Sequence, residues 1–139
     1  MIERARRRIR DAGLADRVEL RVADAAALPW PDGSFDAAFA SFTLELFDTP
    51  EIPVVLGEWR RVLRPGGRLV VVSLSRAAPV GRLTHAYERL HDRFPALLDC
   101  RPIRAAEAVA ACGFAVAGHV ILPLYGLRAE AVLGLRSDR

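Results

Sequence analysis

The sequence predicts an α/β protein built on a parallel sheet. Three segments read as strands: one that ends at Asp24, one from Phe35 to about Ser41, and one from Arg68 to Leu74. The second and third are separated by a stretch whose apolar residues recur every three or four positions, which is typical of a helix. Strand, helix and strand in this order indicate parallel neighbours. The carboxyl ends of such strands meet at one edge of the sheet, where ligands bind.

The N-terminal segment predicts an amphipathic helix. Apolar residues recur at helical steps, and a glycine follows where the helix would end (Ile2, Ala5, Ile9, Ala12 and Gly13). Arginines fill the rest of this surface. Because no aromatic residues lie between them, we interpret them as a solvated face and expect no nucleic-acid partner; a nucleic-acid-binding patch is the alternative.

The next two segments predict strands of different character. Between 17 and 23, apolar Val18, Leu20 and Val22 alternate with charged residues, which favours an edge or partly exposed strand. Pro and Gly residues from 29 to 33 then predict a turn. The stretch from 35 to 42 is almost uniformly apolar, so we expect a central strand covered on both faces.

The second half of the chain predicts further helices and strands. A helix is expected after Asp48, with Leu56, Trp59 and Leu63 on its buried face, and Pro-Gly-Gly at 65 to 67 ends it. Helical spacing recurs from 80 to 94 and from 103 to 112. Two closing strands are expected at about 114 to 122 and 129 to 135.

Length and composition describe one globular domain. The chain has 139 residues, of which 52% are hydrophobic and 27% charged, and this composition excludes a disordered protein. All 20 basic residues are Arg, and the net charge of +3 is too small to indicate a nucleic-acid or lipid partner. We therefore predict a single domain over residues 1–139.

The sequence also excludes several chemistries and locations. Cys100 and Cys112 fit no metal-ligand spacing, so we expect reduced thiols and no metal. No Ser/His/Asp order, zinc spacing or phosphate-binding loop is present. No apolar run approaches the ~18 residues of a membrane span, and none marks an export signal. The expected location is the cytoplasm.

Three motifs carry a family resemblance. They are A-D-A-x-x-L-P-W-P-D-G-S-F-D from Ala23, S-F-T-L-E-L-F-D from Ser41, and R-V-L-R-P-G-G-R-L from Arg61. In this order and at this spacing they resemble the class I S-adenosylmethionine-dependent methyltransferases. Within that family they are similar to the type 11-like small-molecule methylases of ubiquinone and menaquinone synthesis. The resemblance implies a Rossmann-like sheet closed by an antiparallel hairpin, with S-adenosylmethionine as cofactor and a small-molecule acceptor, quinone-like or otherwise aromatic.

One part of the family pattern has no counterpart in this sequence. The glycine-rich turn after the family's first strand is missing, and so is the acidic residue that ends its second strand. We therefore expect a methyltransferase domain that lacks the first βαβ unit of the family pattern: its first strand, glycine-rich turn and second strand are absent. Such a domain would leave strand edges uncovered, and we expect self-association through them and marginal stability.

The resemblance also assigns a cofactor site. It places the adenine against the Asp24 carboxylate and the Ala25 backbone N–H, with Met1 near the same ring. It places Ser41 and Phe42 at the junction between cofactor and acceptor. Two plain alternatives stay open. Asp commonly ends strands because it favours turns, so Asp24 could have that role alone. Phe42 could be a core residue, with the Ser41 side chain hydrogen-bonded to its own backbone.

A base would help where the acceptor must lose a proton before methylation. The weak candidates are His85, Tyr87 and His91, on the helix that the resemblance places beside the acceptor pocket. A charge-paired surface role is the alternative for His85, and His119 is expected to be structural. Two functions follow as hypotheses: methyl transfer to a small molecule, or a catalytically silent interaction or regulatory subunit.

Overall fold

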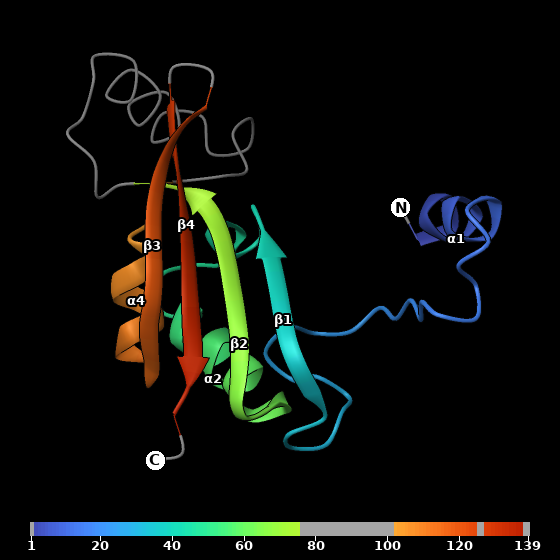
Figure 1. Cartoon of the computed structure of the whole chain (residues 1–139), viewed down its shortest axis with the longest axis horizontal. Helices are drawn as coiled ribbons and strands as arrows, with labels where there is room; N and C mark the ends of the chain where they lie inside the picture. The colour runs from blue at the N-terminus through green and yellow to red at the C-terminus, as the bar shows by residue number, and fades with distance from the viewer. Residues whose placement is uncertain (1, 76–101, 125–126, 138–139) are drawn as a thin grey trace.

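The computed structural model describes residues 2–75, 102–124 and 127–137. Four strands form one sheet in the order β1-β2-β4-β3 (Figure 1). The strands are β1 Phe35–Ser41, β2 Leu63–Leu74, β3 Phe114–Leu124 and β4 Leu127–Arg136. The helices are α1 Ile2–Asp11, α2 Ile52–Val62 and α4 Ala105–Ala111, with a short 3-10 helix, η1, at Leu44–Leu46.

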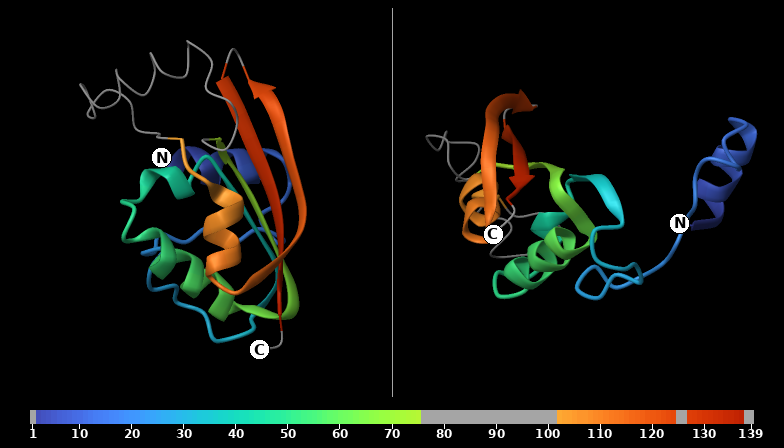
Figure 2. Two further views of the ribbon diagram at one scale, coloured as in Figure 1. Left: turned by 90° about the vertical axis from the view of Figure 1, so that its left-hand side faces the viewer. Right: turned by 60° about the horizontal axis from the view of Figure 1, so that its bottom comes forward.

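The pairing of the strands confirms the predicted α/β class. β1 and β2 are parallel and are joined through α2, whereas β4 runs antiparallel to both β2 and β3. The predicted closing hairpin is therefore present as β3 and β4. Both α2 and α4 lie on the same face of the sheet, as the views in Figures 1 and 2 show.

One hydrophobic core fills the space between these two helices and the sheet. Leu56, Trp59 and Leu63 are buried in it, as predicted. Helix α4 approaches β4 closely at Gly134, where a Cβ would lie 2.9 Å from Cγ1 of Val109. The remaining buried members come from all four strands, the two helices, η1 and the segment before α4 (Ala40, Leu44, Ile52, Val55, Leu69, Val71, Ile103, Ala105, Val109, Phe114 and Val132).

The position of β1 corrects a prediction. The sequence favoured a central strand covered on both faces, but β1 is the terminal strand of the described sheet, and Phe39 is 71% exposed. The physical reason is the lack of a neighbour, because no described strand pairs with the outer edge of β1. An apolar run indicates that the side chains of a strand are suited to burial. In this structure one face and one edge of β1 are nevertheless not covered by described residues.

The prediction of a strand from 17 to 23 is also wrong. This stretch forms no strand in the structure, and Val22 is 83% exposed. A strand needs a partner for its backbone groups, and no described segment pairs with these residues. Helix α1 forms as predicted and ends at Asp11, two residues before Gly13 with its φ of +65°, but none of its residues is buried. Figure 1 shows α1 standing apart from the sheet.

Strand β2 begins five residues earlier than predicted, at Leu63 instead of Arg68. Phe35 pairs with Leu63 and Ala37 with Arg68, so the residues between 63 and 68 form an irregularity in the β1–β2 pair. Gly66 has φ +71°, and a Cβ at Gly67 would lie 2.7 Å from the Arg64 carbonyl oxygen. The Pro-Gly-Gly sequence therefore makes a tight bulge at the start of β2 and does not form a separate turn.

The described helices are all short. Within residues 2–75, 102–124 and 127–137, none is long and apolar enough to cross a membrane.

Candidate cofactor site at the end of strand β1

Strand β1 ends abruptly at Ser41. The Phe42 N–H still donates to the Val72 carbonyl oxygen over 2.8 Å, and the Thr43 hydroxyl donates to the Ser41 carbonyl oxygen over 3.0 Å. Between them Phe42 adopts φ +49°, a left-handed conformation that costs a non-glycine residue about 1–3 kcal/mol. Such strain persists where surrounding contacts enforce it and is frequent at ligand sites. Ser41 is exposed and Phe42 is partly buried at this strand end.

The turn at Asp24 is held by its own side chain. One carboxylate oxygen accepts a hydrogen bond from the Ala26 N–H over 2.9 Å, and the Ala27 N–H donates to the Asp24 carbonyl oxygen over 3.1 Å. Asp24 is exposed, whereas Ala25 and Ala26 pack against the core. The turn role left open for Asp24 is therefore present, and it uses only one of the two carboxylate oxygens among the described hydrogen bonds.

One hollow lies near both predicted site segments, but its lining includes none of Asp24, Ala25, Ser41 and Phe42. It has a volume of about 330 Å³ and lies at the open edge of β1, between that strand and α2. Leu28 comes from the turn, Thr43 from the end of β1, and Trp59 from α2. Its other lining residues are mostly apolar and come largely from β1 (Phe35, Ala37, Ala38, Phe39, Ala40, Val62 and Leu69).

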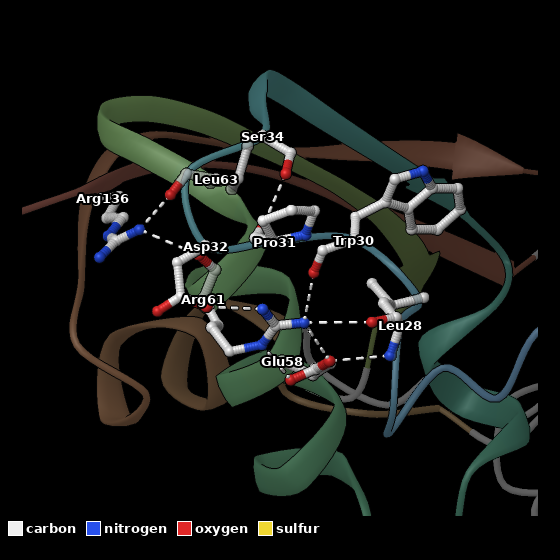
Figure 3. A network of polar contacts seen from close by, with 9 residues as sticks. All are labelled: Leu28, Trp30, Pro31, Asp32, Ser34, Glu58, Arg61, Leu63 and Arg136. Atoms are coloured by element: carbon white, nitrogen blue, oxygen red, sulfur yellow. Dashed lines mark hydrogen bonds and ion pairs between the residues drawn. The ribbon is translucent and has the colours of Figure 1, made fainter.

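A polar network fixes the loop after Asp24 to α2 (Figure 3). The Arg61 guanidinium binds the Glu58 carboxylate over 2.7 Å and 2.9 Å, and the Asp32 carboxylate over 2.6 Å. It also donates to the carbonyl oxygens of Leu28 and Trp30 over 3.1 Å and 2.9 Å. Glu58 in turn accepts from the Leu28 N–H over 2.7 Å. One arginine therefore sets the course of residues 28–32 beside the hollow.

Both charges of this network are stabilised by their contact. The hydrogen bond from Arg61 lowers the pKa of Glu58, and hydrogen bonds to Glu58 and Asp32 raise the pKa of Arg61. The pair therefore stays ionised at neutral pH. Next to it, the rings of Trp30 and Phe35 meet edge to face with centroids 5.3 Å apart. These contacts anchor the loop on both sides of its proline residues.

A buried carboxyl group, missed in the sequence, lies beyond the ends of β1 and β2. Glu45 is 2% exposed, and its Oε1 accepts a hydrogen bond from the Leu74 N–H over 3.2 Å. Its second oxygen has no partner among the described residues. Burial raises the pKa of Glu45 above its ordinary value, because the charged form loses hydration.

We expect Glu45→Gln to stabilise the protein at neutral pH. A carboxyl group whose pKa is raised by folding favours the folded state fully below its ordinary pKa. That contribution is lost as the pH rises through the raised value. Glutamine keeps an acceptor for the Leu74 N–H and carries no charge. Urea unfolding between pH 4 and pH 8 should therefore show a stability advantage of the variant over wild type that grows with pH.

Glu107→Gln serves as the control, because Glu107 is an exposed carboxylate paired with Arg104. A Glu45→Gln variant that is less stable than wild type at neutral pH would contradict the prediction. It would mean that the ionised carboxylate has a favourable partner.

His85, Tyr87, His91, Cys100 and Met1 lie outside the described residues. His119 lies in β3, with its Nε2 3.0 Å from Oε1 of the buried Glu130, which agrees with the expected structural role. Cys112 is partly buried, and burial raises the pKa of its thiol. No described group of His, Cys, Asp and Glu side chains could hold a metal ion.

Comparison with protein families decides the class. The family model described as "Methyltransferase domain" matches residues 1–71, which is half of the chain and includes α1, the Asp24 turn, β1 and α2. The chain belongs to the class I S-adenosylmethionine-dependent methyltransferases. The predicted resemblance is therefore confirmed at the level of the family.

Individual relatives of this methyltransferase chain agree with the match. The ubiquinone/menaquinone biosynthesis C-methyltransferase UbiE of Paracoccus denitrificans is 43% identical over 89 residues, which cover 64% of this chain and 34% of that protein. The chain thus spans about a third of the length of the curated relatives that it matches.

Solved structures confirm the Rossmann-like fold. The [4+2]-cyclase SpnF superposes with a TM-score of 0.75 at 21% identity, over 96% of this chain and 61% of that chain. The 1,6-didemethyltoxoflavin-N1-methyltransferase of Burkholderia thailandensis, solved with S-adenosylhomocysteine, has a TM-score of 0.69 at 16% identity, over 91% of this chain and 54% of that chain. At these identities the likeness concerns the fold alone.

The donor set of the Asp24 turn is chemically suited to adenine. An adenine edge needs an acceptor for its amino group and a donor for its ring nitrogen. The exposed Asp24 carboxylate is such an acceptor, and none of the described hydrogen bonds outside helices and strands uses the Ala25 N–H. The chain has no G-x-G sequence, so this fit concerns the adenine end of S-adenosylmethionine only.

Proposed function

We propose that the chain takes part in S-adenosylmethionine-dependent methyl transfer to a small-molecule acceptor, quinone-like or otherwise aromatic. The observation that carries this proposal is the hollow beside β1, which is lined by Leu28, four residues after Asp24, and by Thr43, next to the strained Phe42. The quinone-like acceptor rests on the similarity to UbiE, which is named as a C-methyltransferase of ubiquinone and menaquinone biosynthesis.

The proposed roles follow from the chemistry of each residue. The Asp24 carboxylate accepts a hydrogen bond from the adenine amino group, and the Ala25 N–H donates to the ring. Ser41 and Phe42 line the junction between cofactor and acceptor. The cofactor supplies an activated methyl group, so the protein mainly has to align the acceptor and exclude water. The apolar lining of the hollow suits this second task.

An acceptor that must lose a proton would need a base. His85, Tyr87 and His91 remain the candidates for that role. Replacing each by an isosteric or small residue would affect turnover and leave cofactor binding unchanged if the residue acts on the acceptor alone.

We expect S-adenosylhomocysteine to bind the chain saturably in calorimetry, and Asp24→Ala to weaken that binding by about 10–100-fold. The range corresponds to the ~1.5–3 kcal/mol of a hydrogen bond to a charged group. Asp24→Asn keeps an oxygen for the Ala26 N–H and for the adenine amino group, so its loss should be smaller. Asp16→Ala, an exposed aspartate before the same segment, controls for the loss of a negative charge.

The second hypothesis is a catalytically silent subunit that binds or regulates another methyltransferase. It is favoured by the absence of a G-x-G motif from the 139 residues, since such a motif would hold the methionine end of the cofactor. A folded wild-type chain that binds no S-adenosylhomocysteine would overturn the first proposal and favour this one. Equal losses in Asp24→Ala and Asp16→Ala would remove the adenine role from Asp24.

A further inference from the structure

Strand β1 leaves the sheet one step before its pairing with β2 could continue. The two strands are parallel and lie side by side (Figure 2), and Ser41 is paired with Val72. The Phe42 N–H then donates to the Val72 carbonyl oxygen over 2.8 Å. In a regular parallel ladder, the next hydrogen bond would join the Leu74 N–H to the Phe42 carbonyl oxygen. In this structure the Leu74 N–H donates to a side chain instead.

A buried carboxylate takes the place of the Phe42 carbonyl oxygen. Oε1 of Glu45 accepts the hydrogen bond from the Leu74 N–H over 3.2 Å. The Leu74 carbonyl oxygen, on the same edge of β2, accepts from the Ile103 N–H over 3.0 Å. Both backbone groups of Leu74 that would face β1 are therefore bonded to other segments. Glu45 is 2% exposed and the preceding Leu44 is fully buried, so η1 is anchored in the core and fixes the carboxylate.

This exchange of acceptors allows the chain to turn at Phe42. A strand that continued would need extended backbone there, but Phe42 has φ +49°. None of the hydrogen bonds described for residues 2–75, 102–124 and 127–137 uses its carbonyl oxygen. A backbone carbonyl without an internal partner can accept a hydrogen bond from an N–H or O–H group of a ligand. The carboxylate of Glu45 therefore acts on the residue at the end of β1, where the cofactor and the acceptor are expected to meet.

We propose that Glu45 is a positioning residue for this junction: its carboxylate replaces the Phe42 carbonyl oxygen on β2 and so holds Phe42 in its left-handed conformation. The inference rests on the proposed function, because it takes Phe42 as part of the ligand site. A carboxylate with a purely structural role would contribute to stability alone. A positioning role additionally predicts a change in the backbone of Phe42 and in ligand affinity.

We expect Glu45→Ala to weaken the binding of S-adenosylhomocysteine by about tenfold or more in calorimetry. Without the carboxylate, the Leu74 N–H regains the Phe42 carbonyl oxygen as its acceptor, and Phe42 becomes extended. Glu45→Gln keeps an oxygen for the Leu74 N–H, so its affinity should stay within about twofold of wild type. Glu45→Met fills the space without a strong acceptor and replaces the alanine variant if that variant does not fold.

Glu130→Ala is the matched control. Glu130 is also a fully buried carboxylate that accepts one backbone N–H, from Ala106 over 3.0 Å, but it lies in β4 and bonds to α4. Its loss should lower the stability and leave the affinity for S-adenosylhomocysteine unchanged. Circular dichroism would check that each variant folds.

NMR chemical shifts of the Phe42 Cα and Cβ provide a readout that needs no ligand, because they depend on the backbone conformation. They should change from left-handed to extended values in Glu45→Ala or Glu45→Met. They should remain at the wild-type values in Glu45→Gln and Glu130→Ala.

Two results would overturn the proposal. Unchanged Phe42 shifts in a folded variant without the carboxylate would show that the turn does not depend on Glu45. Equal losses of affinity in Glu45→Ala and Glu130→Ala would identify a general loss of stability as the cause. A wild-type chain that binds no S-adenosylhomocysteine would instead overturn the proposed function, and the Phe42 shifts would still decide whether Glu45 holds the turn.

Discussion

Leu56→Ala is expected to lower the free energy of unfolding by about 2–5 kcal/mol. Leu56 is fully buried at the centre of the core between α2 and the sheet. Truncation removes the γ methine and the two δ methyl carbons and leaves a cavity that the neighbouring side chains fill only in part. Because a domain of this size is stable by only ~5–15 kcal/mol, the loss is a large fraction of the total. Urea unfolding followed by circular dichroism would measure it.

Val54→Ala is the matched control for this prediction. Val54 lies two residues earlier on the same helix and is 56% exposed. Its truncation should change the stability by no more than about 0.5 kcal/mol. Equal costs at the two positions would contradict the packing of α2 on the sheet, since only Leu56 faces the core.

Elements whose partners lie within the chain could be predicted from sequence. The spacing of Leu56 and Trp59 identified the buried face of α2, because that face packs on β2, the next element along the chain. Leu63 is buried as predicted, but it is the first residue of β2. The closing hairpin was also predicted, since its two strands pair with each other. In both cases the spacing of apolar residues agrees with the contacts that the element makes in the fold. A sequence shows that spacing directly, so such elements can be predicted from it.

Elements without a described partner could not be predicted in the same way. Val18, Leu20 and Val22 alternate with charged residues as in a strand, but alternation specifies a side-chain pattern and provides no hydrogen-bonding neighbour. For β1 the apolar composition correctly indicated a strand and wrongly indicated its position. Phe39 has a large apolar side chain of the kind found in central strands, but it lies exposed in an edge strand.

The candidate site shows the same division. Asp24 and Ser41 were found because they end segments predicted as strands and because the family resemblance assigns them to the cofactor site, and their proposed ligand roles remain predictions. Glu45, Arg61 and Glu130 were missed, because their partners lie 24 to 33 residues away in the sequence. A signal existed for two of them. Glu45 lies between two leucines and Glu130 between two alanines, and a charge inside an apolar run often marks a buried, hydrogen-bonded group.

Glu130→Ala is expected to lower the free energy of unfolding by at least ~1–3 kcal/mol. Glu130 is fully buried in β4, and its Oε1 accepts a hydrogen bond from the Ala106 N–H, at the start of α4, over 3.0 Å. The first N–H groups of a helix have no partner within the helix, so this carboxylate acts as the acceptor for one of them. Alanine leaves that N–H without its acceptor and adds a cavity. Urea unfolding would measure the loss.

Glu130→Gln separates the two roles that this side chain could have. Glutamine keeps an oxygen for the Ala106 N–H and loses the charge that faces His119, whose Nε2 lies 3.0 Å from the carboxylate. If the bond to α4 dominates, the glutamine variant should retain most of the wild-type stability. Hydrogen exchange should then show faster opening of α4 in Glu130→Ala alone. If glutamine costs as much as alanine, the contact with His119 is the main contribution, and His119→Ala should reproduce the same loss. Either result would assign a structural role to the Glu130 side chain in β4, the strand that lies between β2 and β3.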